Sequence, residues 1–110
     1  MERAVLVYTT WPSVVEAEQA GRQIVERRLA ACVNILPGMI SHYWWQGKIE
    51  SSAEVLIIFK AAKSKLKALE KLIVAQHPYD MPEFLALPLA AGNGRYLAWL
   101  AGSLKSQQPT

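Results

Sequence analysis

The spacing of apolar and polar residues divides the first third of the chain into a strand and a helix. Residues 3–10 are β-branched and aromatic without a helical period, which is typical of a buried strand. Over residues 13–30 the apolar side chains recur at helical spacing and the charged ones fill the other face, so we predict an amphipathic helix. Ser13 and Glu16 have the spacing of a capping box at its start.

The middle of the chain is predicted to form two long strands joined by a tight turn. Residues 31–45 have strand composition, interrupted at Pro37-Gly38, where the missing proline N–H favours a bulge or a bend. Gln46-Gly47 stands where a two-residue hairpin turn requires positive φ, which glycine adopts at low cost. Residues 48–60 return as the second strand. This hairpin is longer than a small sheet needs, so we expect its outer half to pack on another surface.

The last third supplies a helix, a short strand and a final helix. Ser64 is predicted to cap a helix that ends at His77, because a residue before proline avoids the helical conformation. Residues 83–89 form a short apolar strand, and Asn93 caps the last helix. The resulting order predicts an α+β fold with a ferredoxin-like β-α-β-β-α-β antiparallel sheet, an added C-terminal helix and both crossover helices on one face.

Composition limits the chain to one domain, and it suggests that part of its surface is covered by partners. The 110 residues are enough for one core, so we expect a single domain over 1–104 and a disordered tail over 105–110. Charged residues make up only 19% of the chain and hydrophobic residues 52%, which indicates that apolar surface is buried against other subunits. A net charge of +3 does not by itself indicate nucleic acid.

The single cysteine and the N-terminal residues favour a cytoplasmic protein. Cys32 cannot form a disulfide within the chain, so the fold does not depend on oxidation. The apolar run at residues 4–8 is too short for a signal peptide or a membrane span. We therefore expect no membrane contact.

Three adjacent aromatic residues, Tyr43, Trp44 and Trp45, precede the hairpin turn. Each side chain buries roughly 150–250 Å² when it is covered, so leaving all three wet is costly. Strand alternation places Tyr43 and Trp45 on one face and Trp44 on the other. A subunit interface is the favoured interpretation, with packing on the protein's own core or a ligand-stacking site as alternatives.

The segment at 77–83 contains several side chains that could bind a metal. His77 is followed by Asp80 and Glu83, and neutral histidine and carboxylates are common metal ligands. The alternative is a structural turn in which His77 caps the preceding helix. Cys32 stands among apolar neighbours and is more typical of a small buried residue than of a reactive thiol.

The remaining motifs exclude several classes of protein. The lysine-rich run over 60–71 is typical of a solvated helix face, and the aromatic RNA-binding motif of domains with this topology is missing, so we expect no nucleic acid. The sequence has no glycine-rich phosphate loop, no Cys-x-x-Cys pair and no plausible catalytic triad.

Three segments together resemble the CutA family of divalent-cation tolerance proteins. They are RLAACVNILPG at 28–38, YWWQGKIE at 43–50, and HPYDMPE at 77–83, the last followed by Leu87-Pro88, Gly92-Asn93, Tyr96-Leu97 and Trp99. The resemblance covers roughly residues 4–104. It implies a ferredoxin-like subunit in a tight homotrimer that is assembled through the long hairpin strands, and a cytoplasmic role in tolerance of copper and other divalent metals. It implies no established catalytic reaction and no required cofactor.

The resemblance carries over only part of a metal site. Some family members are credited with a copper site made of a cysteine near the end of the first strand and two adjacent histidines before the proline. Thr9, Thr10 and Gln76 stand at those positions here, so only His77 matches. The predicted ligands for copper or another divalent cation are therefore His77, Cys32, Asp80 and Glu83.

Two other functions remain open at this stage. The family's shape is similar to that of the trimeric PII signalling proteins, so the alternative is a trimer that binds a small metabolite or anion between subunits, near Lys48, Glu50 and Lys60. A hydrolase at the 77–83 segment is the third hypothesis, but the acylphosphatase-like topology would require an arginine-bearing loop after the first strand. Residues 9–12 provide none. We therefore expect a binding or scaffold protein and not an enzyme.

Overall fold

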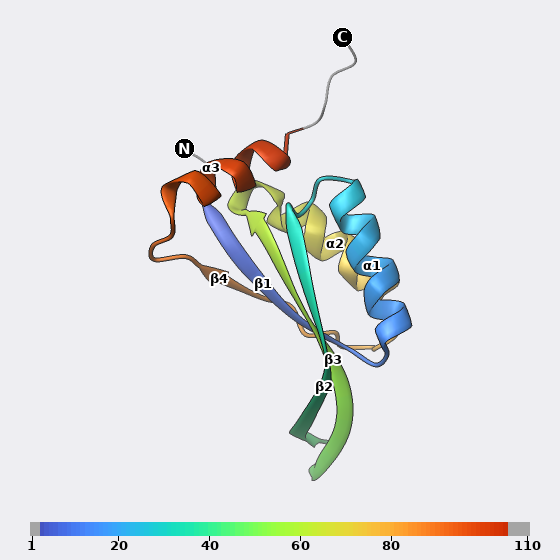
Figure 1. Cartoon of the computed structure of the whole chain (residues 1–110). Coiled ribbons are helices and arrows are strands. Elements are labelled where there is room, and N and C mark those ends of the chain that lie inside the picture. Colours follow the sequence, from blue (N-terminus) through green and yellow to red (C-terminus); the bar gives the residue numbers. More distant parts are fainter. Residues whose placement is uncertain (1–2, 106–110) are drawn as a thin grey trace.

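A four-stranded antiparallel sheet in the order β2-β3-β1-β4 forms the centre of the molecule. The computed structural model describes residues 3–105. The strands are β1 (Ala4–Trp11), β2 (Cys32–Trp45), β3 (Lys48–Ala62) and β4 (Leu85–Pro88), and the helices are α1 (Val14–Glu26), α2 (Leu66–Gln76) and α3 (Gly94–Ser103). Figure 1 shows α1 and α2 on one face of the sheet and α3 across the end where β1 begins. The predicted α+β ferredoxin-like order is confirmed.

Alternation along the central strands produces the core between the sheet and its two helices. Val7 of β1 pairs with Phe59 of β3, and both are fully buried with Ile57 against the helices. Ile24 of α1 and Ile73 of α2 complete this layer and are equally buried. We call this side of the sheet the helix-covered face.

The opposite face of the same strands is also apolar, but neither crossover helix covers it. The register pairs Leu6 with Leu87 and Tyr8 with both Ile58 and Leu85, so these side chains share one face. Within one chain Leu85 is 54% exposed and Leu87 is 48% exposed. We call this side the open face; α3 covers only its upper end, through Leu100 and Leu104 packed near Ala62.

The β2–β3 hairpin extends well beyond the other strands (Figure 1). The strand register shifts between Leu36 and Met39, and Gly38 has a φ of 87°, so the predicted bulge at Pro37-Gly38 is confirmed. Gln46 and Gly47 have φ angles of 50° and 78°, as a two-residue turn with positive φ at both positions requires. Residues beyond the bulge pair only with one another, which elongates the molecule to 53 Å along its longest axis.

The helix ends follow the sequence with two differences. Ser13 and Asn93 cap their helices by accepting the N–H of Glu16 and Tyr96, as predicted. The prediction that Ser64 caps the second helix is wrong, because residues 63–65 form a 3₁₀ turn and α2 begins at Leu66 without a side-chain cap. The first helix ends at Glu26 and not near residue 30, because Arg28 adopts a left-handed φ of 58°.

The predicted C-terminal tail falls almost entirely outside the described residues. Only Lys105 of the segment 105–110 is described, just after the turn that ends α3. The disordered tail therefore stays a prediction. Among residues 3–105, no helix is both long and apolar enough to cross a membrane.

Candidate functional site

A cleft of about 860 Å³ lies between the hairpin and the segment that joins α2 to β4. Tyr8 and Thr10 of β1 and Glu54 of β3 form part of its lining. Residues 39–43 and Trp45 of β2 contribute one wall, and the segment at 78–81 with Glu83 contributes the other. We refer to residues 77–83 as the 77–83 loop. The cleft has the volume of a small-molecule site.

His77 anchors the 77–83 loop to the end of β1. Its Nε2 donates to the carbonyl oxygen of Thr10 at 2.7 Å, and its Nδ1 accepts the N–H of Tyr79 at 3.1 Å. These two bonds assign the neutral ring with its proton on Nε2. The ring lies 4.3 Å from the Trp11 ring and 4.7 Å from the Tyr79 ring, centroid to centroid.

These contacts hold the His77 ring in the interior, although an accessible metal ligand would lie at the surface. The residue is only 8% exposed, because the backbone turns to an extended conformation at His77 and the ring packs against Trp11. The structural interpretation of His77, as the residue that ends α2 and fixes the loop, fits these contacts. A metal bound at this ring would have to displace one of its two hydrogen bonds.

Glu54 is the residue of this site that sequence reasoning missed. Although it is a carboxylate, it is only 8% exposed, and its Oε2 accepts the hydroxyl of Tyr79 at 3.0 Å. Burial and the adjacent Glu54 carboxylate raise the pKa of Tyr79 to about 12, so the phenol stays protonated and donates at neutral pH. The sequence signal that could have pointed to Glu54 is its position directly before the apolar run 55–59. In the structure it pairs with the half-buried Met39.

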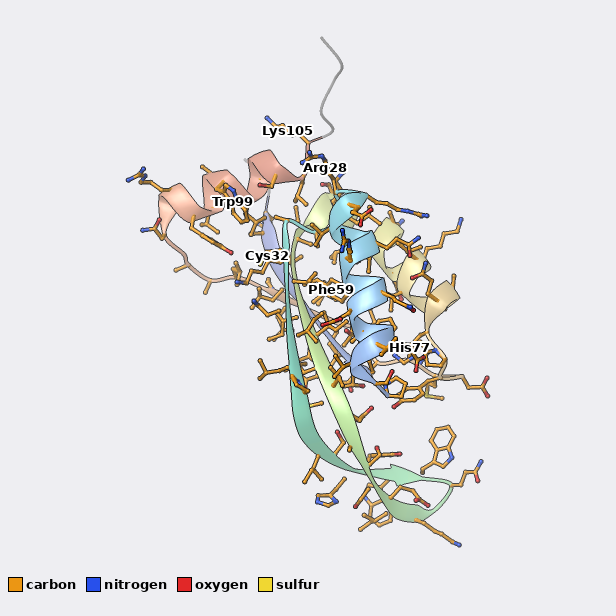
Figure 2. The ribbon with its side chains drawn as sticks, turned by 45° about the vertical axis from the view of Figure 1, so that its right-hand side comes forward. Arg28, Cys32, Phe59, His77, Trp99 and Lys105 are labelled. Carbon is orange, nitrogen blue, oxygen red and sulfur yellow. The ribbon has the colours of Figure 1, made fainter. Side chains whose placement is uncertain are left out.

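The four predicted metal ligands do not converge on one point. Asp80 and Glu83 line the cleft, and Thr10 donates to Glu83 at 3.4 Å. Cys32 lies at the start of β2 opposite Lys60, far along the sheet from the labelled His77 in Figure 2. No three His, Cys, Asp or Glu side chains of residues 3–105 come together as a metal-ion group. The described residues of one chain therefore do not fit a single copper centre.

The aromatic residues of the hairpin divide as alternation predicts. Tyr43 and Trp45 line the cleft and are 42% and 44% exposed, whereas Trp44 pairs with Ile49 outside the cleft lining and is 73% exposed. Packing of Trp44 on the core of its own chain is therefore absent. An interface role for the three residues stays a prediction.

The residues predicted to bind a small anion lie apart. Lys48 and Glu50 are at the hairpin tip, whereas Lys60 is ten residues beyond Glu50 along β3, roughly 33 Å away from Glu50 at the rise of an extended strand. The Lys60 ammonium lies 5.6 Å from the centroid of the Tyr96 ring on α3. Within one chain these three residues do not form one pocket, and none of them lines the cleft described above.

Comparison with known proteins gives one consistent result. Residues 5–103 match the family model described as CutA1 divalent ion tolerance protein. The divalent-cation tolerance protein CutA of Thermus thermophilus is 45% identical over 100 residues, which cover 91% of this chain and 95% of that protein. The crystal structure of CutA1 from Oryza sativa superimposes with a TM-score of 0.91 at 42% identity, covering 96% of this chain and 97% of that one.

The lengths and printed locations of the relatives differ. The chain spans 58% of the length of the chloroplastic CutA 1 protein of Oryza sativa, at 44% identity, but 93% of the length of the Pectobacterium atrosepticum protein, at 43% identity. One structural relative, from Archaeoglobus fulgidus, is described as a periplasmic divalent cation tolerance protein. The compartment thus varies among proteins of the same fold.

Proposed function

The chain belongs to the CutA1 divalent ion tolerance family, and we propose that it is a homotrimeric, metal-responsive binding or scaffold protein without a catalytic reaction of its own. The observation that supports assembly most strongly is the open face of the sheet. Leu85, Leu87 and Leu36 leave about half or more of their surface exposed there in a single chain. Apolar area of this extent on one side of a small domain is typical of a protein–protein interface.

The partner we propose for the open face is further copies of the same chain. The hairpin projects from the body of the subunit and carries Trp44 and Ile49, which lie outside the cleft lining and leave most of their surface exposed. An edge strand such as β2 also presents unpaired backbone groups along its outer side, which another strand can satisfy. The number three rests on the family, and a cytoplasmic location remains part of the proposal, supported by the single unpaired Cys32.

The metal part of the proposal has weaker support from the side chains. Copper is expected to bind weakly, because both ring nitrogens of His77 are engaged in hydrogen bonds. The carboxylates of Asp80 and Glu83 in the cleft are then the predicted ligands that remain for the metal. Copper(II) accepts mixed oxygen and nitrogen donors, and fewer strong ligands lower the affinity. A role in tolerance can therefore operate through weak or shared sites.

Native mass spectrometry of the purified protein tests both parts in one experiment. We expect a complex of three subunits whose copper occupancy rises gradually with added metal and falls in Asp80→Asn and His77→Ala variants. Glu18→Gln, an exposed carboxylate on α1, is the control. Single subunits throughout the titration would contradict the scaffold, whereas tight copper binding untouched by these substitutions would place the site elsewhere, with Cys32 the next residue to test.

The absence of catalysis is tested separately. No nucleophile–base pair is evident at the 77–83 loop, since His77 is buried between two rings and bonded at both nitrogens. We expect no hydrolysis of phosphate or acyl esters above background. Turnover that survives repurification and is lost in His77→Ala would overturn this part of the proposal. The PII-like alternative, binding of a small anion, stays a prediction that a nucleotide titration of the same protein decides.

A further inference from the structure

The cleft between the hairpin and the 77–83 loop is acidic, although the whole chain carries a net charge of +3. Its lining contains the carboxylates of Glu54, Asp80 and Glu83, and none of the described residues that line it is a lysine or an arginine. His42 is the one basic side chain in the lining. A concave site lined by charges of one sign concentrates ligands of the opposite sign, so this cleft favours cations.

The charge of Glu54 is only partly compensated within the chain. The residue is 8% exposed, and its Oε2 accepts the Tyr79 hydroxyl. Among residues 3–105 no fully buried side-chain oxygen is left without a hydrogen-bond partner, so Oε1 of Glu54 faces the solvent of the cleft, where a cation can reach it. A poorly hydrated carboxylate attracts a cation more strongly than one in open water does. Tyr79 donates a hydrogen bond but, as a neutral phenol, supplies no positive charge. A cationic ligand would supply the missing charge.

The walls of the cleft have the chemistry that holds organic cations. The rings of Tyr43 and Trp45 form part of one side, and Tyr8 and Tyr79 contribute to the others. A positive charge near an aromatic face is attracted by the ring quadrupole. A volume of about 860 Å³ is far larger than a bare ion and suits an organic molecule.

From these observations we infer that the cleft is a binding site for a small organic cation, an amine, guanidinium or quaternary ammonium compound, whose charge is held by Glu54 and whose body lies against Tyr43 and Trp45. A bare metal ion is a poorer occupant, because no three acidic, histidine or cysteine side chains of residues 3–105 converge as ligands. The sign of the ligand's charge is also opposite to that required by an anion-binding PII-like site. The inference goes beyond the proposed metal response and does not rest on it.

The test uses the full chain in its natural assembly and cations with matched neutral or anionic compounds. Choline is compared with 3,3-dimethylbutan-1-ol, which has its shape without its charge, and agmatine with glutarate. Binding is followed by calorimetry and by tryptophan fluorescence, since Trp45 lines the cleft. We expect saturable binding of choline or agmatine and no saturable binding of the neutral alcohol or the dicarboxylate. Equal binding of charged and neutral compounds, or no binding of either cation, would overturn the inference.

Variants locate the site. Glu54→Gln is expected to weaken binding of the cation at least tenfold, and Glu83→Gln about threefold, because Glu83 is exposed at the rim. Glu18→Gln removes an exposed carboxylate outside the cleft and should leave the affinity unchanged. If Glu54→Gln does not fold, Asp80→Asn together with Glu83→Gln takes its place. Affinity that is the same in the cleft variants and in Glu18→Gln would contradict the assignment. If a neighbouring subunit fills the cleft, the cation will not bind, and the inference is overturned. The number of subunits is measured in a separate experiment, so failure of the inference and failure of the proposed assembly can be told apart.

Discussion

The helix-covered face and the open face of the sheet are built from the same strands, yet they meet different surroundings. Val7, Ile57 and Phe59 on one face are fully covered by α1 and α2. Leu6, Tyr8 and their β4 partners on the other face are half-buried or exposed in one chain. Both faces carry mostly apolar side chains in the region where β1 and β3 pair, as strands buried on both sides do. The difference supports the proposal that the chain folds around one face and assembles through the other.

The largest expected effect comes from the helix-covered face. Phe59→Ala removes a fully buried ring and leaves a cavity that the surrounding helices cannot fill. We expect the free energy of unfolding to fall by about 3–5 kcal/mol. Urea denaturation followed by circular dichroism measures it, and an unchanged midpoint would contradict the assignment of this face as the core.

A charge on the open face should separate folding from assembly. Leu87→Glu places a carboxylate on β4 where one chain leaves the side chain 48% exposed, so the subunit can fold around it. In an assembly that covers this face the charge is buried without a partner and costs several kcal/mol. We expect native circular dichroism with a mass that shifts toward the single subunit. A variant that keeps the mass of the wild type would show that this part of the open face is not an interface.

The hairpin should contribute a smaller amount to the same assembly. Trp44 is 73% exposed in one chain, and truncating an interface tryptophan typically costs about 2–4 kcal/mol of association. We expect Trp44→Ala to dissociate at higher protein concentration than the wild type does, with little change in the fold. Val15→Ala, an exposed apolar residue on α1, is the control. Equal dissociation of the two variants would remove Trp44 from the interface.

The smallest expected effect is local to the cleft at the edge of the open face. Because the folded protein holds the pKa of Tyr79 at about 12, above the usual value of 10, stability from this group is complete below pH 10 and is lost as the pH rises toward 12. Ultraviolet absorbance should show one tyrosine that ionises late. Glu54→Gln should lower the pKa of Tyr79 toward 10 without reaching it, because burial is the larger cause of the raised pKa. Late ionisation that is unchanged in this variant would contradict the Glu54–Tyr79 contact.

The sequence was sufficient for most of the fold because local signals agreed with the tertiary structure. The Gln46-Gly47 turn, the bulge at Pro37-Gly38 and the Asn93 cap depend on neighbours in sequence, and all three are confirmed. The Ser64 cap failed because a 3₁₀ turn precedes α2 and moves its first residue to Leu66. Cap chemistry alone does not determine where such a turn ends.

The candidate site was less predictable because its contacts join distant segments. Sequence order brought His77, Asp80 and Glu83 together, but it could not show that His77 turns inward onto Trp11 and bonds to Thr10. Glu54 meets Tyr79 across 25 positions of the chain, and the 3.0 Å contact between its Oε2 and the Tyr79 hydroxyl exists only in the folded structure. The site therefore depends on pairings that composition and local spacing do not encode.

The mass of the wild-type protein in solution tests the contrast between the two faces most directly. Light scattering at micromolar concentration should give about 37 kDa, three times the 12.3 kDa subunit, if two further copies of the chain cover the open face as we propose. A mass of 12.3 kDa at that concentration would mean that the open face stays exposed to water. That result would contradict both the assembly and the function proposed from it.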